Sequence, residues 1–150
     1  MKSNHLGASD GMTRRARGFS LIELMIVVVV LAIIASIGYP SYTSYVTRSS
    51  REAAKSELLQ LSNVQEKVYL NSSSYATSIT AVYDGSSGGG LGKTSGRTSD
   101  GKYTLAITPN AGPTQSYSIT ATPVAGTSQN GDGNITISSD GTRTWGGANW

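Results

Sequence analysis

The sequence contains no cysteine among its 150 residues, and its one histidine is His5. Without cysteine, neither a disulfide framework nor a thiolate metal site can form. Aspartate is scarce, and each one precedes glycine, a pair typical of turns, at Asp10, Asp84, Asp100, Asp132 and Asp140. No nucleophile–base pair or carboxylate pair can be assembled from this inventory. The sequence therefore predicts a protein that is not an enzyme and that has no catalytic residues, cofactor or metal.

Charged residues are also few, at 14% of the chain, and they are unevenly placed. Residues 1–18 hold four basic side chains against one acidic, whereas the remainder has eight of each. A polyanion-binding interpretation of the whole chain therefore loses its main support. A small DNA-binding patch formed by Lys93, Arg97 and Lys102 stays possible, although such a group beside acids is more often a solvated loop.

The segment Asn130–Asn134 alternates oxygen-bearing side chains with glycine, as the start of a calcium loop does. Only Asp132 in it is charged, and the glutamate that closes such loops is missing. We therefore expect a glycine-rich turn there.

One long apolar run occupies residues 19–39, and its only charge is Glu23. About 20 apolar residues span a bilayer core, so the run is long enough to cross a membrane. Arginines crowd its N-terminal edge and tyrosines follow it, at Arg14, Arg15, Arg17, Tyr39, Tyr42 and Tyr45. This arrangement predicts a cytoplasmic N-terminus, an exported remainder and an aromatic belt at the far surface.

Two simpler interpretations of the run fit less well. A cleaved secretory signal has a shorter apolar region with small residues after it, whereas Gly18 lies before this one. A plain membrane anchor leaves Glu23 unexplained, because a carboxylate in lipid costs about 2.5–3.5 kcal/mol.

The residues around the start of the run carry a family resemblance. The heptapeptide RGFSLIE at 17–23 resembles the cleavage motif of type IV prepilins, and the run to Tyr42 is similar to their N-terminal helix. The segment 39–42 and the stretch 51–75 look most like PilE-type subunits, which are often minor pilins. The resemblance implies cleavage between Gly18 and Phe19 by prepilin peptidase and methylation of the new Phe19 amine. Residues 1–18 would be the leader, which would be shorter if translation starts at Met12.

Glu23 has a physical role to match this processing. Cleavage would leave a cationic amine on Phe19, four residues before Glu23 and on the same face of a helix. We expect the carboxylate to pair with that amine, in its own subunit or an incoming one, and so to set the register of assembly.

Beyond the apolar run, the pattern predicts an amphipathic helix followed by a β-meander, and the resemblance implies the type IV pilin fold. This is an α+β fold in which a long N-terminal helix packs on a C-terminal antiparallel β-sheet. We expect a hydrophobic helix at 19–48 and a periplasmic head at 49–150, made of an amphipathic helix at 49–70, a loop at 71–101 and a meander at 102–150. Gly38 and Pro40 are expected to kink the helix. Many relatives carry a C-terminal disulfide, and here Trp145 and Trp150 are the candidates to hold the tail instead.

The resemblance implies a structural subunit of a type IV pilus that supports twitching motility, surface adhesion or DNA uptake. Two alternatives stay open, a type II secretion pseudopilin and a competence pilin that binds DNA. The implied partners are other pilin subunits, prepilin peptidase and the inner-membrane assembly machinery. The implied location is the inner membrane before assembly and the extracellular pilus afterwards.

Overall fold

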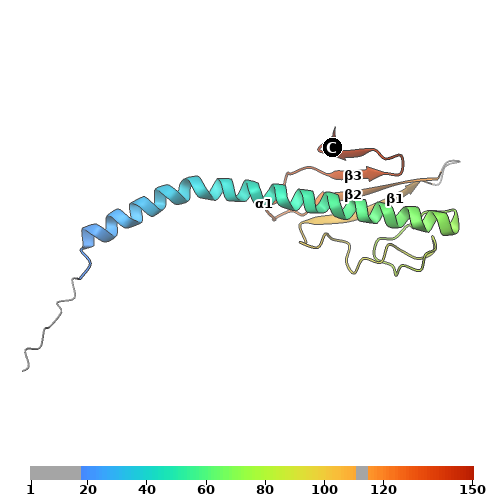
Figure 1. Ribbon diagram of the computed structural model, residues 1–150, viewed down its shortest axis with the longest axis horizontal. Helices are drawn as coiled ribbons and strands as arrows, with labels where there is room; N and C mark the ends of the chain where they lie inside the picture. Colours follow the sequence, from blue (N-terminus) through green and yellow to red (C-terminus); the bar gives the residue numbers. More distant parts are fainter. Residues whose placement is uncertain (1–17, 111–114) are drawn as a thin grey trace, which may run out of the picture. The chain divides into compact units, whose positions relative to one another are not determined.

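The computed structural model describes residues 18–110 and 115–150, so Arg14, Arg15, Arg17 and most of the predicted leader lie outside the described residues. The chain divides into two compact units, one ending at Gly38 and the other running from Tyr39 to Trp150. One helix, α1 (Leu21–Ser72), is followed by five strands (Figure 1). The predicted α+β class with a long N-terminal helix is confirmed.

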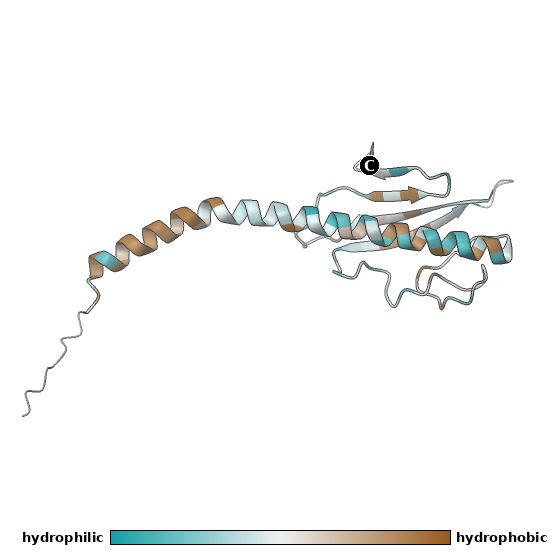
Figure 2. Cartoon of the chain, viewed as in Figure 1, coloured by the Kyte–Doolittle hydropathy of each residue, from teal (hydrophilic) through white to brown (hydrophobic). Residues whose placement is uncertain are grey.

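The part of α1 in the first unit is apolar and uncovered. It starts after Ser20, a residue type favoured at helix N-caps, whose carbonyl accepts the amide of Leu24 at 3.2 Å. An 18-residue window of the helix has a mean hydropathy of 2.9, and none of it is buried inside the protein. Figure 2 shows this stretch as mostly hydrophobic, with one hydrophilic patch in the first turn, where Glu23 lies. The helix is thus long and apolar enough to cross a membrane.

Gly38 and Pro40 lie within the helical assignment, which continues unbroken to Ser72. Proline has no backbone N–H to give to the preceding turn. Two hydroxyls on either side bond carbonyls of their own turn, Ser36 to Ile33 at 2.7 Å and Thr43 to Pro40 at 3.0 Å. A kink at these positions stays a prediction.

In the second unit, α1 buries one stripe of side chains spaced three or four apart, at Ser50, Ala54, Leu58, Leu61, Gln65 and Val68. The helix ends at Ser72, close to the predicted end at residue 70, because Ser73 takes a left-handed φ of 53°. The Ser73 amide donates to the Tyr69 carbonyl at 2.8 Å, and this hydrogen bond closes the last turn of the helix.

The five strands form one antiparallel sheet in sequence order. They are β1 (Tyr103–Asn110), β2 (Ser116–Pro123), β3 (Ile135–Ser138), β4 (Arg143–Trp145) and β5 (Ala148–Asn149). All five lie within the stretch 102–150 in which a meander is predicted. The two-residue strand β5 was not predicted, since it is too short to show a period.

Alternation along the strands turns one face of the sheet toward the helix. The buried strand residues are Tyr103, Leu105, Tyr117, Ile119, Ala121, Ile135 and Ile137, and they share one cluster with Leu58, Leu61 and Val68 of α1. Among residues 18–110 and 115–150, the buried apolar side chains lie between Ala54 and Ile137. The second unit therefore has a complete core without any residue before Tyr39.

The loop between α1 and β1 has a defined backbone course, although its composition predicts flexibility. The side-chain amide of Gln65, which is fully buried, accepts the Ala76 amide at 2.9 Å and donates to the Ala76 carbonyl at 2.8 Å. Further along, Ser78 and Gly90 form a parallel bridge. A Cβ at Gly90 would stand 2.4 Å from the Ala81 carbonyl oxygen, so the close approach requires glycine.

Candidate functional site

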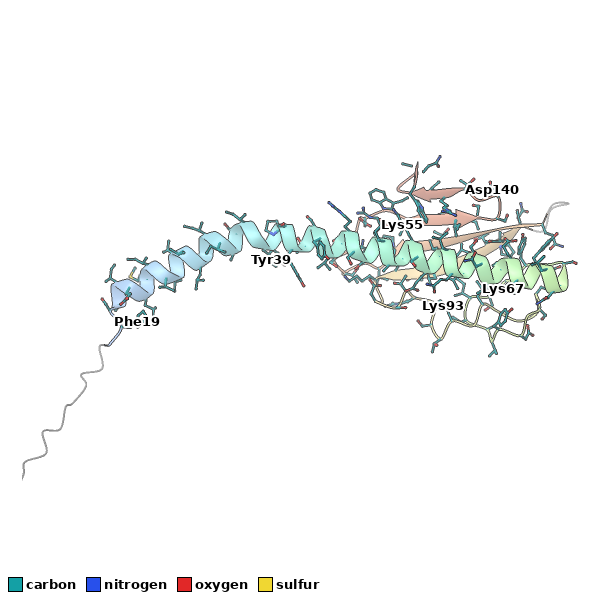
Figure 3. All side chains as sticks on the ribbon, in the orientation of Figure 1. Phe19, Tyr39, Lys55, Lys67, Lys93 and Asp140 are labelled. Atoms are coloured by element: carbon teal, nitrogen blue, oxygen red, sulfur yellow. The ribbon has the colours of Figure 1, made fainter. Side chains whose placement is uncertain are left out.

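The predicted processing residues lie at the start of the described chain. Gly18 and Phe19 precede α1, and Phe19 is 74% exposed (Figure 3). A Cβ on Gly18 would meet nothing within 4 Å, so packing inside this chain does not explain the glycine. Glu23 lies in the first turn of α1 and is exposed. Because the helix starts at Leu21, the helical spacing assumed for Phe19 and Glu23 requires α1 to extend toward Phe19.

Asp132 is the centre of a buried polar cluster in the head. Its carboxylate accepts hydrogen bonds from Arg51 through Nε at 2.8 Å and through Nη2, from the Tyr103 hydroxyl at 2.7 Å and from Gln129 Nε2 at 2.7 Å. Only 6% of the Asp132 side chain is exposed. Burial alone would raise the Asp132 pKa, but these donors outweigh it and lower the pKa to about 2.

This cluster settles the role of the segment Asn130–Asn134. Asp132 contributes an anchor for α1, reaching a residue 81 positions earlier in the chain. Turn bonds hold the segment, including the Asp132 amide on the Gln129 carbonyl at 3.0 Å. These bonds form the glycine-rich turn expected for this segment. Within residues 18–110 and 115–150, no group of three His, Cys, Asp or Glu side chains could hold a metal ion. The role of Asp132 is one that the Asp-Gly pattern did not reveal.

The two tryptophans pack under cations from the helix. The Arg51 guanidinium lies 3.8 Å from the centre of the Trp145 ring, and Lys55 Nζ lies 4.9 Å from that of Trp150. Trp145 Nε1 donates to the Asp132 carbonyl at 2.7 Å, and Trp150 Nε1 donates to the Thr144 carbonyl at 3.0 Å. Cation–π contacts of this kind contribute about 0.5–2 kcal/mol each. These contacts fasten the C-terminal strands to α1 in a chain without cysteine.

A second ion pair fastens the loop to the helix. Glu57 binds the Lys93 ammonium and accepts the Ser99 amide at 2.8 Å. Burial would raise the Glu57 pKa, but the donors at Lys93 and Ser99 outweigh it, and the pKa is lowered.

The basic patch considered at Lys93, Arg97 and Lys102 is not a group of three free charges. Lys93 is bound to Glu57, and Lys102 Nζ donates to the Ser50 hydroxyl at 2.8 Å. Arg97 is exposed. Across the described head, the cations outside the three ion pairs are Arg48, Lys67, Arg97, Lys102 and Arg143. Any binding of a polyanion would therefore use this spread set rather than the loop alone.

Two family models match the chain, and together they cover most of it. Residues 13–39 match the prokaryotic N-terminal methylation motif. Residues 40–136, more than half of the chain, match the family described as "Type IV minor pilin ComP, DNA uptake sequence receptor". No curated protein matches the chain.

The methylation motif and the uncovered apolar helix fit anchoring in the inner membrane followed by assembly into a pilus. Membership of the type IV pilin family implies association with other pilin subunits and with the assembly machinery. The pilin match begins at residue 40 within α1 and continues through the loop, β1 and β2 to the start of β3, so it covers most of the head, while the methylation motif covers the apolar half of α1. The chain belongs to the ComP family of type IV minor pilins.

Proposed function

We propose that prepilin peptidase cuts this chain between Gly18 and Phe19, that Phe19 is then N-methylated, and that residues 19–48 carry the subunit into the filament. The observation that supports this most strongly is the apolar half of α1, in which no residue of the membrane-length window is buried in the chain. Such a surface is stable only in lipid or against other apolar helices. The chain has no catalytic role in this proposal.

In the filament, Glu23 pairs with the Phe19 amine of its own or a neighbouring subunit. An unpaired carboxylate costs about 2.5–3.5 kcal/mol in an apolar core, so a subunit at the wrong height is disfavoured. Unlike Glu52, which is exposed on the head half of α1, Glu23 lies in the apolar half.

Mass spectrometry of sheared pili tests the processing, with an N-terminal methylated Phe19 expected. Glu23→Ala and Glu23→Gln should abolish or strongly reduce incorporation of the subunit, whereas Glu52→Gln should not. Normal incorporation of both Glu23 variants would refute the registry role. A subunit that keeps its leader in pili would refute the processing.

We also propose that the head captures DNA during uptake. The family match over 40–136 supports this role, because that family is described as a DNA uptake sequence receptor. The exposed cations outside ion pairs supply the contacts that phosphates need. Arg97 is the sharpest single probe, since it is exposed and its backbone bridges Thr104 at the edge of the sheet.

A gel-shift titration with duplex DNA at several salt concentrations tests this role. Arg97→Gln should weaken binding and reduce the slope of log affinity against log salt by about 0.9, whereas Arg97→Lys should keep the slope. The proposal would be contradicted if the unaltered chain and both variants bound DNA only at very low salt and showed equal slopes of log affinity against log salt.

A further inference from the structure

The outer face of the sheet is covered with hydroxyl groups and carries no charge. Its outward positions pair across the strands, with Thr104 opposite Thr122, Thr120 opposite Thr136 and Ser118 opposite Ser138. Adjacent strands lie about 4.8 Å apart, so these side chains form a regular array. We call this array the hydroxyl face, and it comprises Thr104, Thr108, Ser118, Thr120, Thr122, Thr136, Ser138 and Thr144.

Two hollows of about 290 and 530 Å³ lie at the β1–β2 hairpin, and the larger one includes Thr108, Ser118 and Ser138 of the hydroxyl face. Both are lined by Pro109, Asn110 and Ser116, so they lie on either side of the same pair of strand ends. The smaller hollow also contacts Tyr75, and the larger reaches Asp140. Asp140 lies on the turn between β3 and β4 and is labelled in Figure 3. We call the two hollows together the hairpin groove.

The hairpin groove has the chemistry of a site for neutral polyols. Its lining combines hydroxyl and amide groups, which donate and accept hydrogen bonds, with apolar surface of somewhat larger exposed area, and no lysine or arginine is among the described residues that line either hollow. Asp140 adds one carboxylate acceptor, while Pro109 and Tyr75 offer apolar surface. On the hydroxyl face, the described side-chain bonds link only Thr120 and Thr136, at 3.3 Å. Most of its hydroxyls are therefore open to a ligand.

This lining discriminates among the possible ligands. A nucleic acid or acidic polymer would meet Asp140 with no cation in the lining to compensate. An apolar partner would leave many hydroxyls and the Asn110 amide without hydrogen bonds, which is costly on burial. Sugars match both requirements, since they carry ring C–H faces and many neutral hydroxyls. We propose that the hairpin groove binds a neutral oligosaccharide, and this rests on neither the DNA-capture role nor the assembly role.

The test is saturation-transfer difference NMR on the full chain in a detergent without a sugar headgroup. Lactose, chitobiose and maltose are the neutral probes, and sialyllactose is the acidic match for lactose. We expect transfer to at least one neutral disaccharide, and weaker transfer to sialyllactose than to lactose. Absence of transfer to all three neutral sugars would overturn the proposal, and so would a preference for sialyllactose.

Two variants connect the binding to the groove. Asn110→Ala removes the amide and should weaken binding about fivefold, the effect of one lost hydrogen bond. Asp140→Asn keeps an oxygen for the Thr142 amide, which Asp140 Oδ1 accepts at 2.8 Å, but removes the charge. It should raise sialyllactose binding relative to lactose, an effect that loss of structure would not produce.

Asn130→Ala is the matched control, because Asn130 is an exposed asparagine on another loop and does not line the groove. It should bind as the unaltered chain does. Melting temperatures should agree among all four proteins. Unchanged binding by both Asn110→Ala and Asp140→Asn would place the sugar elsewhere and overturn the assignment of the groove.

Discussion

Replacing Asp132 with asparagine should destabilise the head more than any other single carboxylate-to-amide change. The substitution keeps the shape of the side chain but leaves the Arg51 guanidinium, only 17% exposed, without its counter-charge. Asp132 has a pKa of about 2 in the folded head against a reference value of 3.8. At about 1.4 kcal/mol per pKa unit, the folded environment favours the carboxylate by about 2 kcal/mol. Removing one partner of a buried pair costs about 3–5 kcal/mol, so we expect a loss of about 2–4 kcal/mol.

Urea denaturation of the fragment 39–150, followed by circular dichroism at pH 7, measures this loss. The fragment is suitable because it contains the whole core. Asp84→Asn is the control, since Asp84 is an exposed turn residue whose bond from the Ser86 amide an asparagine oxygen can also accept. The control should denature at the urea concentration that the unaltered fragment requires.

The pH dependence gives an independent check. Because the Asp132 pKa is lower in the folded state than in the unfolded state, its contribution is complete above about pH 4. It is lost as the pH falls toward about 2 and the carboxylate is protonated. Asp132→Asn should therefore flatten the stability profile between pH 4 and 2. Equal stability of variant and unaltered head at pH 7, or an unchanged acid profile, would refute the role assigned to the cluster.

Three further changes test the packing of the head. Trp150→Ala should lower the melting temperature by several degrees in a thermal scan, because it removes the ring beneath Lys55 and the bond to the Thr144 carbonyl. Gln65→Leu should cost about 2 kcal/mol in urea denaturation, since both backbone groups of Ala76 lose their partner; an unchanged midpoint would argue against it. Gly90→Ala should cost about 1–3 kcal/mol by the same assay, as its Cβ would collide with the Ala81 carbonyl, and stability above that of the unaltered head would contradict this contact.

Local patterns in the sequence predict most of the fold. The apolar run, the helical spacing from Ala54 to Val68 and the alternation in β1 to β3 each depend on neighbours within a few residues. They therefore identify elements and buried faces without knowledge of the tertiary structure. The processing residues Gly18, Phe19 and Glu23 likewise belong to one short motif.

Long-range pairings explain what the sequence did not predict. Asp132 looks like any Asp-Gly turn, and its partner Arg51 is 81 residues away. Lys93 looks like part of a basic loop because Glu57, which neutralises it, lies 36 residues earlier. In both cases the sequence shows the charged residue but not the distant partner that neutralises its charge. Local composition therefore overestimated the free positive charge of the loop.

The pairing of Arg51 with Asp132 also bears on how the head survives export. It joins distant parts of the chain by an ion pair that forms and opens reversibly, together with the contact of the Arg51 guanidinium on the Trp145 ring, and no covalent bond is made. A head that crosses the membrane unfolded can therefore close by itself on the far side. Because the chain has no cysteine, folding of the head requires no disulfide formation, and a reducing environment should leave the yield of folded head unchanged.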